Sequence, residues 1–140
     1  MPVEFFLDTN ILVYTFDEAS PEKRMKARAL VEHALEHQTG VISYQVMQEF
    51  LNVATRKFTP PLSAIQALRY LDEVLEPLCR VFSSNELYRK AIGIQDRWRC
   101  SFYDSLIIAS ALSAGCNTLY SEDLQASQSI ESVTIVDPFR

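Results

Sequence analysis

The sequence lacks the features that mark disulfide-rich, zinc-ribbon and membrane-spanning proteins. Its three cysteines (Cys79, Cys100 and Cys116) are far apart, and no Cys-x-x-Cys pair occurs. This argues against a disulfide framework and favours a reducing compartment. No run reaches the ~18 apolar residues that cross a bilayer. No basic region precedes the first apolar run, so we expect no signal peptide and a cytoplasmic protein with no membrane partner.

An excess of basic residues is also absent. The chain has 13 Lys and Arg against 18 Asp and Glu, which gives a formal net charge of −5. This disfavours nucleic acid as a partner, because phosphate binding depends on Lys and Arg. A cluster of metal-binding acids would contribute negative charge that bound cations offset, however. The net charge therefore leaves a nucleic-acid partner open.

Length and composition predict one globular domain over residues 1–140. Hydrophobic residues make up 48% of the 140 residues and charged residues 22%, as in ordinary globular proteins. We find no internal repeat, low-complexity tract or linker. A chain of this length buries roughly 68–70% of its unfolded surface, so it can form a core without disulfides or structural metals.

Segments of strand and helix character alternate along the chain. Strands are predicted at 2–7, 41–42, 80–82, 118–120 and 133–136. Helices are predicted over 11–16, from Pro21 to just before Gly40, and over 44–58, 63–78, 84–98 and 102–114. The helix containing residues 106–112 is apolar nearly all round, which predicts a core position. The alternation predicts an α/β fold with a mainly parallel sheet of four or five strands and helices on both faces.

Several residues predict where helices begin and end. Ser83 and Glu86 fit a capping box, and Ser43 is predicted as an N-cap by its residue type. Gly40 is expected to end the second helix, Pro77 to help end the fourth, and Gly115 to cap the last. In the helix over 63–78, apolar residues, Leu68 among them, fit either the core or a hydrophobic surface for a partner or second protomer.

Polar residues follow the first predicted strand directly. The apolar run 5–7 ends at Asp8, Thr9 and Asn10. Open α/β sheets keep their ligands just past the carboxyl ends of parallel strands, and an Asp there can hold a metal ion. The alternative is a capped turn, because Asp, Thr and Asn all favour turns and N-caps.

Further acids are predicted at the same edge of the sheet. Glu49 lies in the second turn of the helix after the second strand, and Glu122 and Asp123 follow the fourth strand. Asp104 lies in the first turn of the buried helix, and its place at this edge is inferred, because no strand directly precedes that helix. Each has a structural alternative: a capping box of Asp104 with Ser101, a solvated position for Glu49, and a turn for residues 122–123.

Carboxylates that converge in this way need a counterion. At ~4 Å each pair costs about 4 kcal/mol at an effective dielectric of about 20, so without a cation at least one would take up a proton. Mg²⁺ or Mn²⁺ suits such oxygen ligands. These ions lower the pKa of a bound water and stabilise a leaving oxygen. The acids therefore predict phosphodiester hydrolysis with a metal-activated water as nucleophile.

The ordered series of motifs resembles the PIN domain family, and most closely the VapC-type toxin ribonucleases of bacterial toxin–antitoxin pairs. The resemblance covers nearly the whole chain, through residues 6–12, Ser43, Glu49, 101–111, Gly115, 119–124 and 136–139. It implies a three-layer α/β/α fold, Mg²⁺- or Mn²⁺-dependent RNA cleavage, a homodimer, and inhibition by a cognate antitoxin.

The resemblance also implies roles for individual residues. It makes Asp8, Glu49, Asp104 and Asp123 the catalytic and metal-binding acids. Supporting polar groups would be Thr9, Asn10, Ser43, Ser121 and Glu122. Ser121 stands where the family often has Thr, a change that keeps the hydroxyl. The adjacent Glu122 leaves open which acid of the pair faces the metal.

Two other functions remain open from the sequence. A PIN-like fold could serve only to bind RNA or protein. The Asp8-Thr9-Asn10 turn is also similar to that of haloacid-dehalogenase-type phosphatases, but these need a second Asp where this chain has Asn10, and no convincing downstream lysine motif occurs. The basic run Lys23, Arg24, Lys26 and Arg28 fits either RNA phosphates or an ordinary surface helix.

Overall fold

The computed structural model describes residues 3–125 and 128–140. Within these ranges one six-stranded sheet has the order β3-β2-β1-β4-β6-β5, and only the β5–β6 pair is antiparallel. Its strands are β1 (Phe5–Leu7), β2 (Gly40–Ser43), β3 (Cys79–Val81), β4 (Thr118–Tyr120), β5 (Ser129–Ile130) and β6 (Val133–Val136). The predicted α/β fold with a mainly parallel sheet is confirmed.

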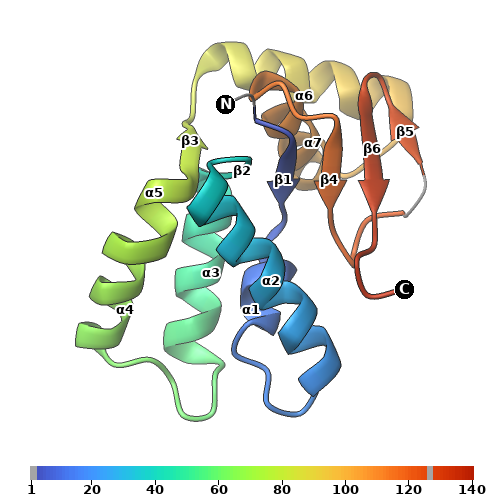
Figure 1. Ribbon diagram of the computed structural model, residues 1–140. Helices are drawn as coiled ribbons and strands as arrows, with labels where there is room; N and C mark the ends of the chain where they lie inside the picture. Colours follow the sequence, from blue (N-terminus) through green and yellow to red (C-terminus); the bar gives the residue numbers. More distant parts are fainter. Residues whose placement is uncertain (1–2, 126–127) are drawn as a thin grey trace.

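Helices cover both faces of the sheet. In Figure 1, α2 lies in front of the sheet, and α7 lies behind it with α6 packed against α7. The helical segments are α1 (Thr9–Tyr14), α2 (Pro21–His37), α3 (Tyr44–Arg56), α4 (Ala64–Tyr70), the π-helical turn η1 (Leu71–Leu75), α5 (Glu76–Leu78), α6 (Asn85–Trp98) and α7 (Phe102–Ser113). No helix in the described part of the chain is long and apolar enough to cross a bilayer.

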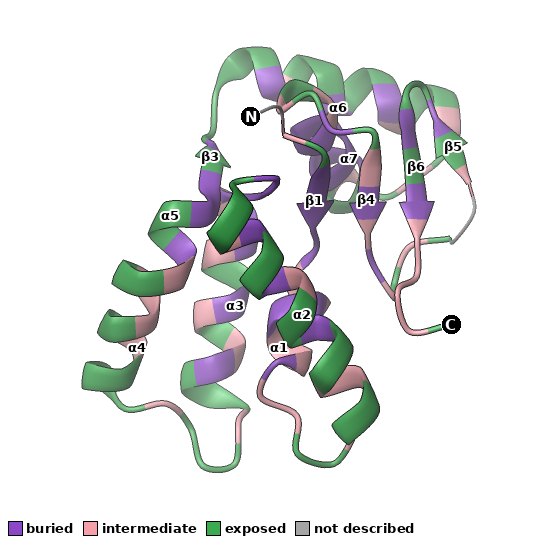
Figure 2. Cartoon of the chain, viewed as in Figure 1, coloured by how far each residue is buried: buried purple, intermediate pink, exposed green. Residues whose placement is uncertain are grey.

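The core lies between these layers. Every residue of β1 and β2 is buried, and residues 105–111 of α7 are buried as well (Figure 2). The all-round apolar character of α7 is explained by its place between the sheet and α6, where neither side of the helix meets solvent. The predicted core position of this helix is confirmed.

Two helix boundaries differ from the sequence prediction. Helix α2 ends at His37 and its C-cap is Gln38, which takes a left-handed conformation with φ of 56°, whereas Gly40 is the first residue of β2. Helix α6 is capped by Ser84, whose Oγ accepts a hydrogen bond from the backbone N–H of Leu87 at 3.1 Å, so the predicted cap at Ser83 is wrong by one residue. Two adjacent serines offer the same chemistry, and the local backbone decides between them.

The predicted continuous helix over 63–78 is divided into three segments. The π-helical turn η1 lies between α4 and α5, and Pro77 lies inside α5, one residue before its end. Proline has no N–H to donate, and a wider turn precedes it here. Helix α4 buries no residue, and Leu68 is 60% exposed, so this part of the helix presents apolar surface.

The strands also depart from prediction at the sheet edges. Strand β1 begins at Phe5, and residue 2 of the predicted strand lies outside the described residues. Strand β3 ends at Val81, and Phe82 is 62% exposed. The sequence analysis missed β5, because two residues are too few to show alternation and the turn to β6 uses Glu131, with φ of 54°, instead of glycine.

Candidate active site

Three parallel strands end at the edge of the sheet where Asp8 lies. The arrowheads of β1, β4 and β6 point the same way in Figure 1. Asp8 follows β1 and donates its backbone N–H to the carbonyl of Tyr120 at 3.0 Å. Ser121 follows β4 and donates its N–H to the carbonyl of Val136 at 3.0 Å. Asp8 and Ser121 are therefore held beside each other by the strand pairing that precedes them.

Asp8 is a buried carboxylate with a hydrogen bond to each oxygen. Its Oδ1 accepts the N–H of Thr9 at 2.8 Å and so caps α1, and its Oδ2 accepts the hydroxyl of Ser121 at 2.7 Å. Burial raises the pKa of Asp8 to about 6, because a charged carboxylate is poorly solvated there. The two hydrogen bonds lower this pKa, and the charges of Glu49 and Asp123 raise it.

Asn10 links Asp8 to the loop after β4. Its Nδ2 lies 3.1 Å from Asp123 Oδ2, 3.4 Å from Asp8 Oδ2 and 3.4 Å from Ser121 Oγ. Its Oδ1 accepts the backbone N–H of Glu122 at 3.2 Å. Asn10 therefore uses both ends of its amide to hold the loop, and its Nδ2 lies between the carboxylates of Asp8 and Asp123.

Thr9 links Glu49 to the same turn. The Thr9 hydroxyl donates to Glu49 Oε1 at 2.8 Å, and Glu49 lies in the second turn of α3, as predicted. Consecutive residues of the Asp8-Thr9-Asn10 turn thus contact two acids from remote parts of the chain. The structure brings Asp8, Glu49 and Asp123 together through these polar residues.

The side chain of Glu122 is held by contacts with α1 and α2. Its carboxylate accepts the hydroxyl of Tyr14 at 2.6 Å and the ammonium of Lys23 at 2.6 Å. These hydrogen bonds, that of Lys23 first, lower the pKa of Glu122. The two adjacent acids thus have different partners: the Asp123 carboxylate contacts Asn10, whereas the Glu122 carboxylate contacts Tyr14 and Lys23.

Asp104 lies in the first turn of α7, where its backbone N–H donates to Ser101 Oγ at 3.1 Å. The Nε2 of Gln45 lies 3.4 Å from the carbonyl oxygen of Tyr103, so this turn contacts the start of α3. Among the described residues, no hydrogen bond joins the Asp104 carboxylate to the other acids. Ser43 caps α3 through its hydroxyl, which accepts the N–H of Val46 at 3.4 Å.

The chemistry of the linked acids fits a hard cation, although they do not form a closed cage. In residues 3–125 and 128–140, no three His, Cys, Asp or Glu side chains are grouped so that they could hold a metal ion. The donors available are carboxylate, hydroxyl and amide oxygens, which Mg²⁺ and Mn²⁺ prefer. Burial, and to a smaller extent the neighbouring acids, raise the pKa of Asp8, and a bound cation would stabilise its charged form.

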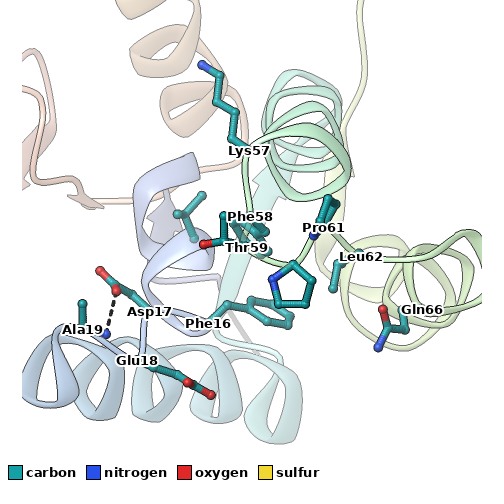
Figure 3. Close-up of a pocket in the computed structure, with 12 residues that line it drawn as sticks. Phe16, Asp17, Glu18, Ala19, Lys57, Phe58, Thr59, Pro61, Leu62 and Gln66 are labelled. Atoms are coloured by element: carbon teal, nitrogen blue, oxygen red, sulfur yellow. Dashed lines mark hydrogen bonds between the residues drawn. The ribbon is translucent and has the colours of Figure 1, made fainter.

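A separate cavity of about 600 Å³ lies at the other end of α1. Asp8 caps the first turn of α1, whereas the residues lining this cavity include Phe16, Phe58, Pro61, Asp17 and Lys57 (Figure 3). None of the predicted site residues lines it. The candidate site is therefore an open group of side chains at the edge of the sheet, distinct from this cavity.

The sequence analysis missed Tyr14 as a contact of the site and interpreted Lys23 only as a surface or RNA-binding residue. Tyr14 belongs to the apolar segment that forms α1, and Lys23 lies in the basic run of α2. No local spacing connects either residue to position 122. Their contact depends on how α1 and α2 pack against the loop after β4.

Solved structures with similar folds include a toxin–antitoxin complex from Klebsiella pneumoniae, with a TM-score of 0.69, 20% identity, and coverage of 96% of this chain and 98% of that chain. VapBC2 from Rickettsia felis, bound to a DNA fragment from its promoter, has a TM-score of 0.66 and 18% identity. This match covers 95% of this chain and 97% of that chain. VapBC-1 from nontypeable Haemophilus influenzae has a TM-score of 0.62 and 19% identity, and the match covers 99% of this chain and 100% of that chain. At these identities the similarity establishes the fold.

Sequence comparison gives the family. Ribonuclease VapC23 of Mycobacterium tuberculosis is 39% identical over 72 residues, which are 49% of this chain and 56% of that protein. The match thus spans little more than half the length of this curated relative. The model of the PIN domain matches residues 5–128, which include Asp8, Glu49, Asp104 and Asp123. The predicted family is confirmed, and the chain belongs to the PIN domain family.

Proposed function

We propose that this protein is an endoribonuclease that depends on Mg²⁺ or Mn²⁺ and hydrolyses RNA phosphodiester bonds. The observation that carries the proposal is the buried carboxylate of Asp8, joined to Asp123 through Asn10 and to Glu49 through Thr9. A fold that holds like charges this close, at the carboxyl ends of parallel strands, fits a cation site. The VapC23 relative, which is named a ribonuclease, supports RNA as the substrate.

In this proposal Asp8, Glu49, Asp104 and Asp123 hold the cation. When bound, the cation supplies the charge that activates the attacking water and stabilises the leaving oxygen. Ser121 and the N–H of Thr9 hold the Asp8 carboxylate in place. The Thr9 hydroxyl and the Asn10 amide hold Glu49 and Asp123 in place.

RNA cleavage by the wild type and by Asp8→Asn, with Mg²⁺, Mn²⁺ or EDTA, tests the proposal. We expect cleavage that needs the metal and is stopped by EDTA. Asp8→Asn should lower the rate by about 100-fold or more, since even outer groups of a metal site are worth ~10–100-fold. Glu32→Gln, which removes an exposed carboxylate of α2, should cleave as the wild type does. Equal activity in a folded Asp8→Asn protein would refute the assignment.

We further propose that the protein is the toxin of a toxin–antitoxin pair and acts in the cytoplasm as a homodimer with a cognate antitoxin. The solved structures of similar fold, whose titles name toxin–antitoxin and VapBC complexes, support this proposal. Expression should arrest growth, and co-expression of a small neighbouring gene product should relieve the arrest. Asp8→Asn should not arrest growth. Normal growth during expression of an active nuclease would contradict the toxin role.

Two alternatives are separated by the same assays. A PIN-like protein used only for binding would retain RNA without cutting it under any metal condition. A haloacid-dehalogenase-type phosphatase would hydrolyse a phosphate monoester such as p-nitrophenyl phosphate. The structure disfavours the phosphatase, because Asn10 occupies the position of its second acid and donates its amide to Asp123.

A further inference from the structure

The carboxylate of Glu122 is held by residues of two other elements. Tyr14 of α1 and Lys23 of α2 each approach one of its oxygens at 2.6 Å. The Lys23 ammonium also lies 4.9 Å from the centroid of the Tyr14 ring and 5.6 Å from that of Phe139. The rings of Tyr14 and Phe139 pack edge to face at 4.9 Å. Glu122 thus contacts α1 and α2, and its two partners pack against Phe139 in the segment after β6.

The backbone of residues 121–124 is held at a second place. The N–H of Glu122 donates to Asn10 Oδ1 at 3.2 Å. The N–H groups of Asp123 and Leu124 each lie 3.2 Å from Ser121 Oγ. Asp123 is exposed, and Asn10 is the hydrogen-bond partner that the structure gives its carboxylate. The place of Asp123 therefore depends on the loop that carries it.

We propose that Glu122 is a positioning residue whose contact with Tyr14 and Lys23 fixes residues 121–124, and so holds Asp123 beside Asn10 and Asp8. This inference rests on the proposed function, since it assigns Asp123 to the cation. In this proposal residues 14, 23 and 122 together hold the loop that carries Asp123 and do not contact the cation themselves. It also assigns Lys23 to this role instead of to RNA phosphates.

Glu122 as a direct ligand of the cation is the rival interpretation, and an exchange of charges separates the two. In the double variant Lys23→Glu with Glu122→Lys, the ion pair is restored in reverse, and the Tyr14 hydroxyl accepts a hydrogen bond from the introduced ammonium. If Glu122 is a positioning residue, the double variant should still bind the metal. If Glu122 is a ligand, the double variant should not, because the exchange places an ammonium where the metal would need an oxygen.

Mn²⁺ affinity of the intact protein, measured by calorimetry or by the electron paramagnetic resonance of free Mn²⁺, gives the main test. We expect Glu122→Ala to weaken Mn²⁺ binding about tenfold, in the range for groups that support metal ligands. Lys23→Met and Tyr14→Phe should each weaken it less. The double exchange should return the affinity to within about threefold of the wild type. Glu32→Ala, which removes an exposed charge elsewhere on α2, should leave it unchanged.

Two results would overturn the inference. Unchanged Mn²⁺ affinity in Glu122→Ala would show that the loop needs no such contact. An affinity of the double exchange at or below that of Glu122→Ala would make Glu122 a ligand.

Amide hydrogen exchange without metal separates this inference from the proposed function. Exchange at residues 122–124 should rise about tenfold in Glu122→Ala and recover in the double exchange. If the wild type neither binds Mn²⁺ nor cleaves RNA, the proposed function fails. The expected change in hydrogen exchange would even then support the fixing of the loop by Glu122. Unchanged exchange would refute it.

Discussion

At the scale of single residues, the turn from Asp8 to Asn10 combines structural and chemical roles. Asp8 caps α1 through one oxygen and receives the Ser121 hydroxyl at the other. The same carboxylate is buried beside two other acids, and the pKa of Asp8 is raised to about 6. A good N-cap is thus also an ionisable group that the fold destabilises in its charged form. The free energy of unfolding should therefore depend on the charge of Asp8.

The raised pKa of Asp8 predicts how stability depends on pH in the absence of metal. The unfolded carboxyl titrates near 3.8 and the folded one near 6, so the stability contributed by its proton is present below about pH 4 and is lost by about pH 6. Asn has no such proton to lose and caps a helix as well as Asp. At pH 7.5 with EDTA, we expect Asp8→Asn to be more stable than the wild type by about 1–3 kcal/mol.

Urea unfolding of both proteins from pH 4 to pH 8 checks this. The difference in free energy of unfolding should shrink toward zero as the pH falls to 4. Glu32→Gln, which removes an exposed carboxylate of α2, should have the same free energy of unfolding as the wild type at every pH. A difference independent of pH would assign the effect to packing or hydrogen bonding and not to the charge of Asp8.

At the scale of elements, α2, β1 and β2 approach one another closely at Gly40. Gly40 opens β2 at the point where it pairs with Phe5. A Cβ at position 40 would meet the ring of Phe5 and lie 2.6 Å from the Cβ of Ala34. Glycine is required here because neighbouring atoms leave no room for a side chain. The sequence analysis assigned Gly40 to the end of a helix, where glycine is common for a different reason.

Gly40→Ala should therefore destabilise the protein by about 1–3 kcal/mol, the usual cost of overpacking. Gly93→Ala is the matched control, because nothing lies within 4 Å of a Cβ at this position in α6. Alanine in a helix interior should stabilise by about 0.5–1 kcal/mol. Thermal melting of both variants gives the comparison. A Gly40→Ala protein as stable as the wild type would show that Phe5 and Ala34 move aside easily.

At the scale of the whole molecule, the parallel sheet determines which residues meet. β2 and β4 both pair with β1, although some 75 residues of sequence separate them, and the carboxyl ends of these parallel strands share one edge. The edge gathers acids that repel one another without a counterion. Ligand binding and global stability are therefore expected to be coupled.

Under the proposed function, a bound cation should stabilise the entire fold. At a Mn²⁺ concentration of about 100 times the dissociation constant, the gain is about 2.7 kcal/mol, or roughly 5–15 °C in Tm. EDTA should reverse the shift, and Asp8→Asn should show a much smaller one. Differential scanning calorimetry measures both. An equal shift in the two proteins would place the Mn²⁺ outside the acidic group.

The sequence alone determined the alternation of strands and helices, the buried α7, and the Asp8-Thr9-Asn10 turn, because hydrophobic period and capping chemistry act over a few residues. It also placed Glu49 in the second turn of α3 and residues 122–123 after β4. The short β5 and the division of the 63–78 helix carried no clear local signal.

Only the tertiary structure decided which acid of the 122–123 pair approaches Asp8. Either carboxylate satisfies the local pattern, and the choice depends on Tyr14 and Lys23, which α1 and α2 bring to Glu122. The tertiary structure also joined Thr9 to Glu49 and Asn10 to Asp123. Contacts between residues 40 to 113 positions apart depend on how the helices pack around the sheet, and that packing is a property of the whole chain.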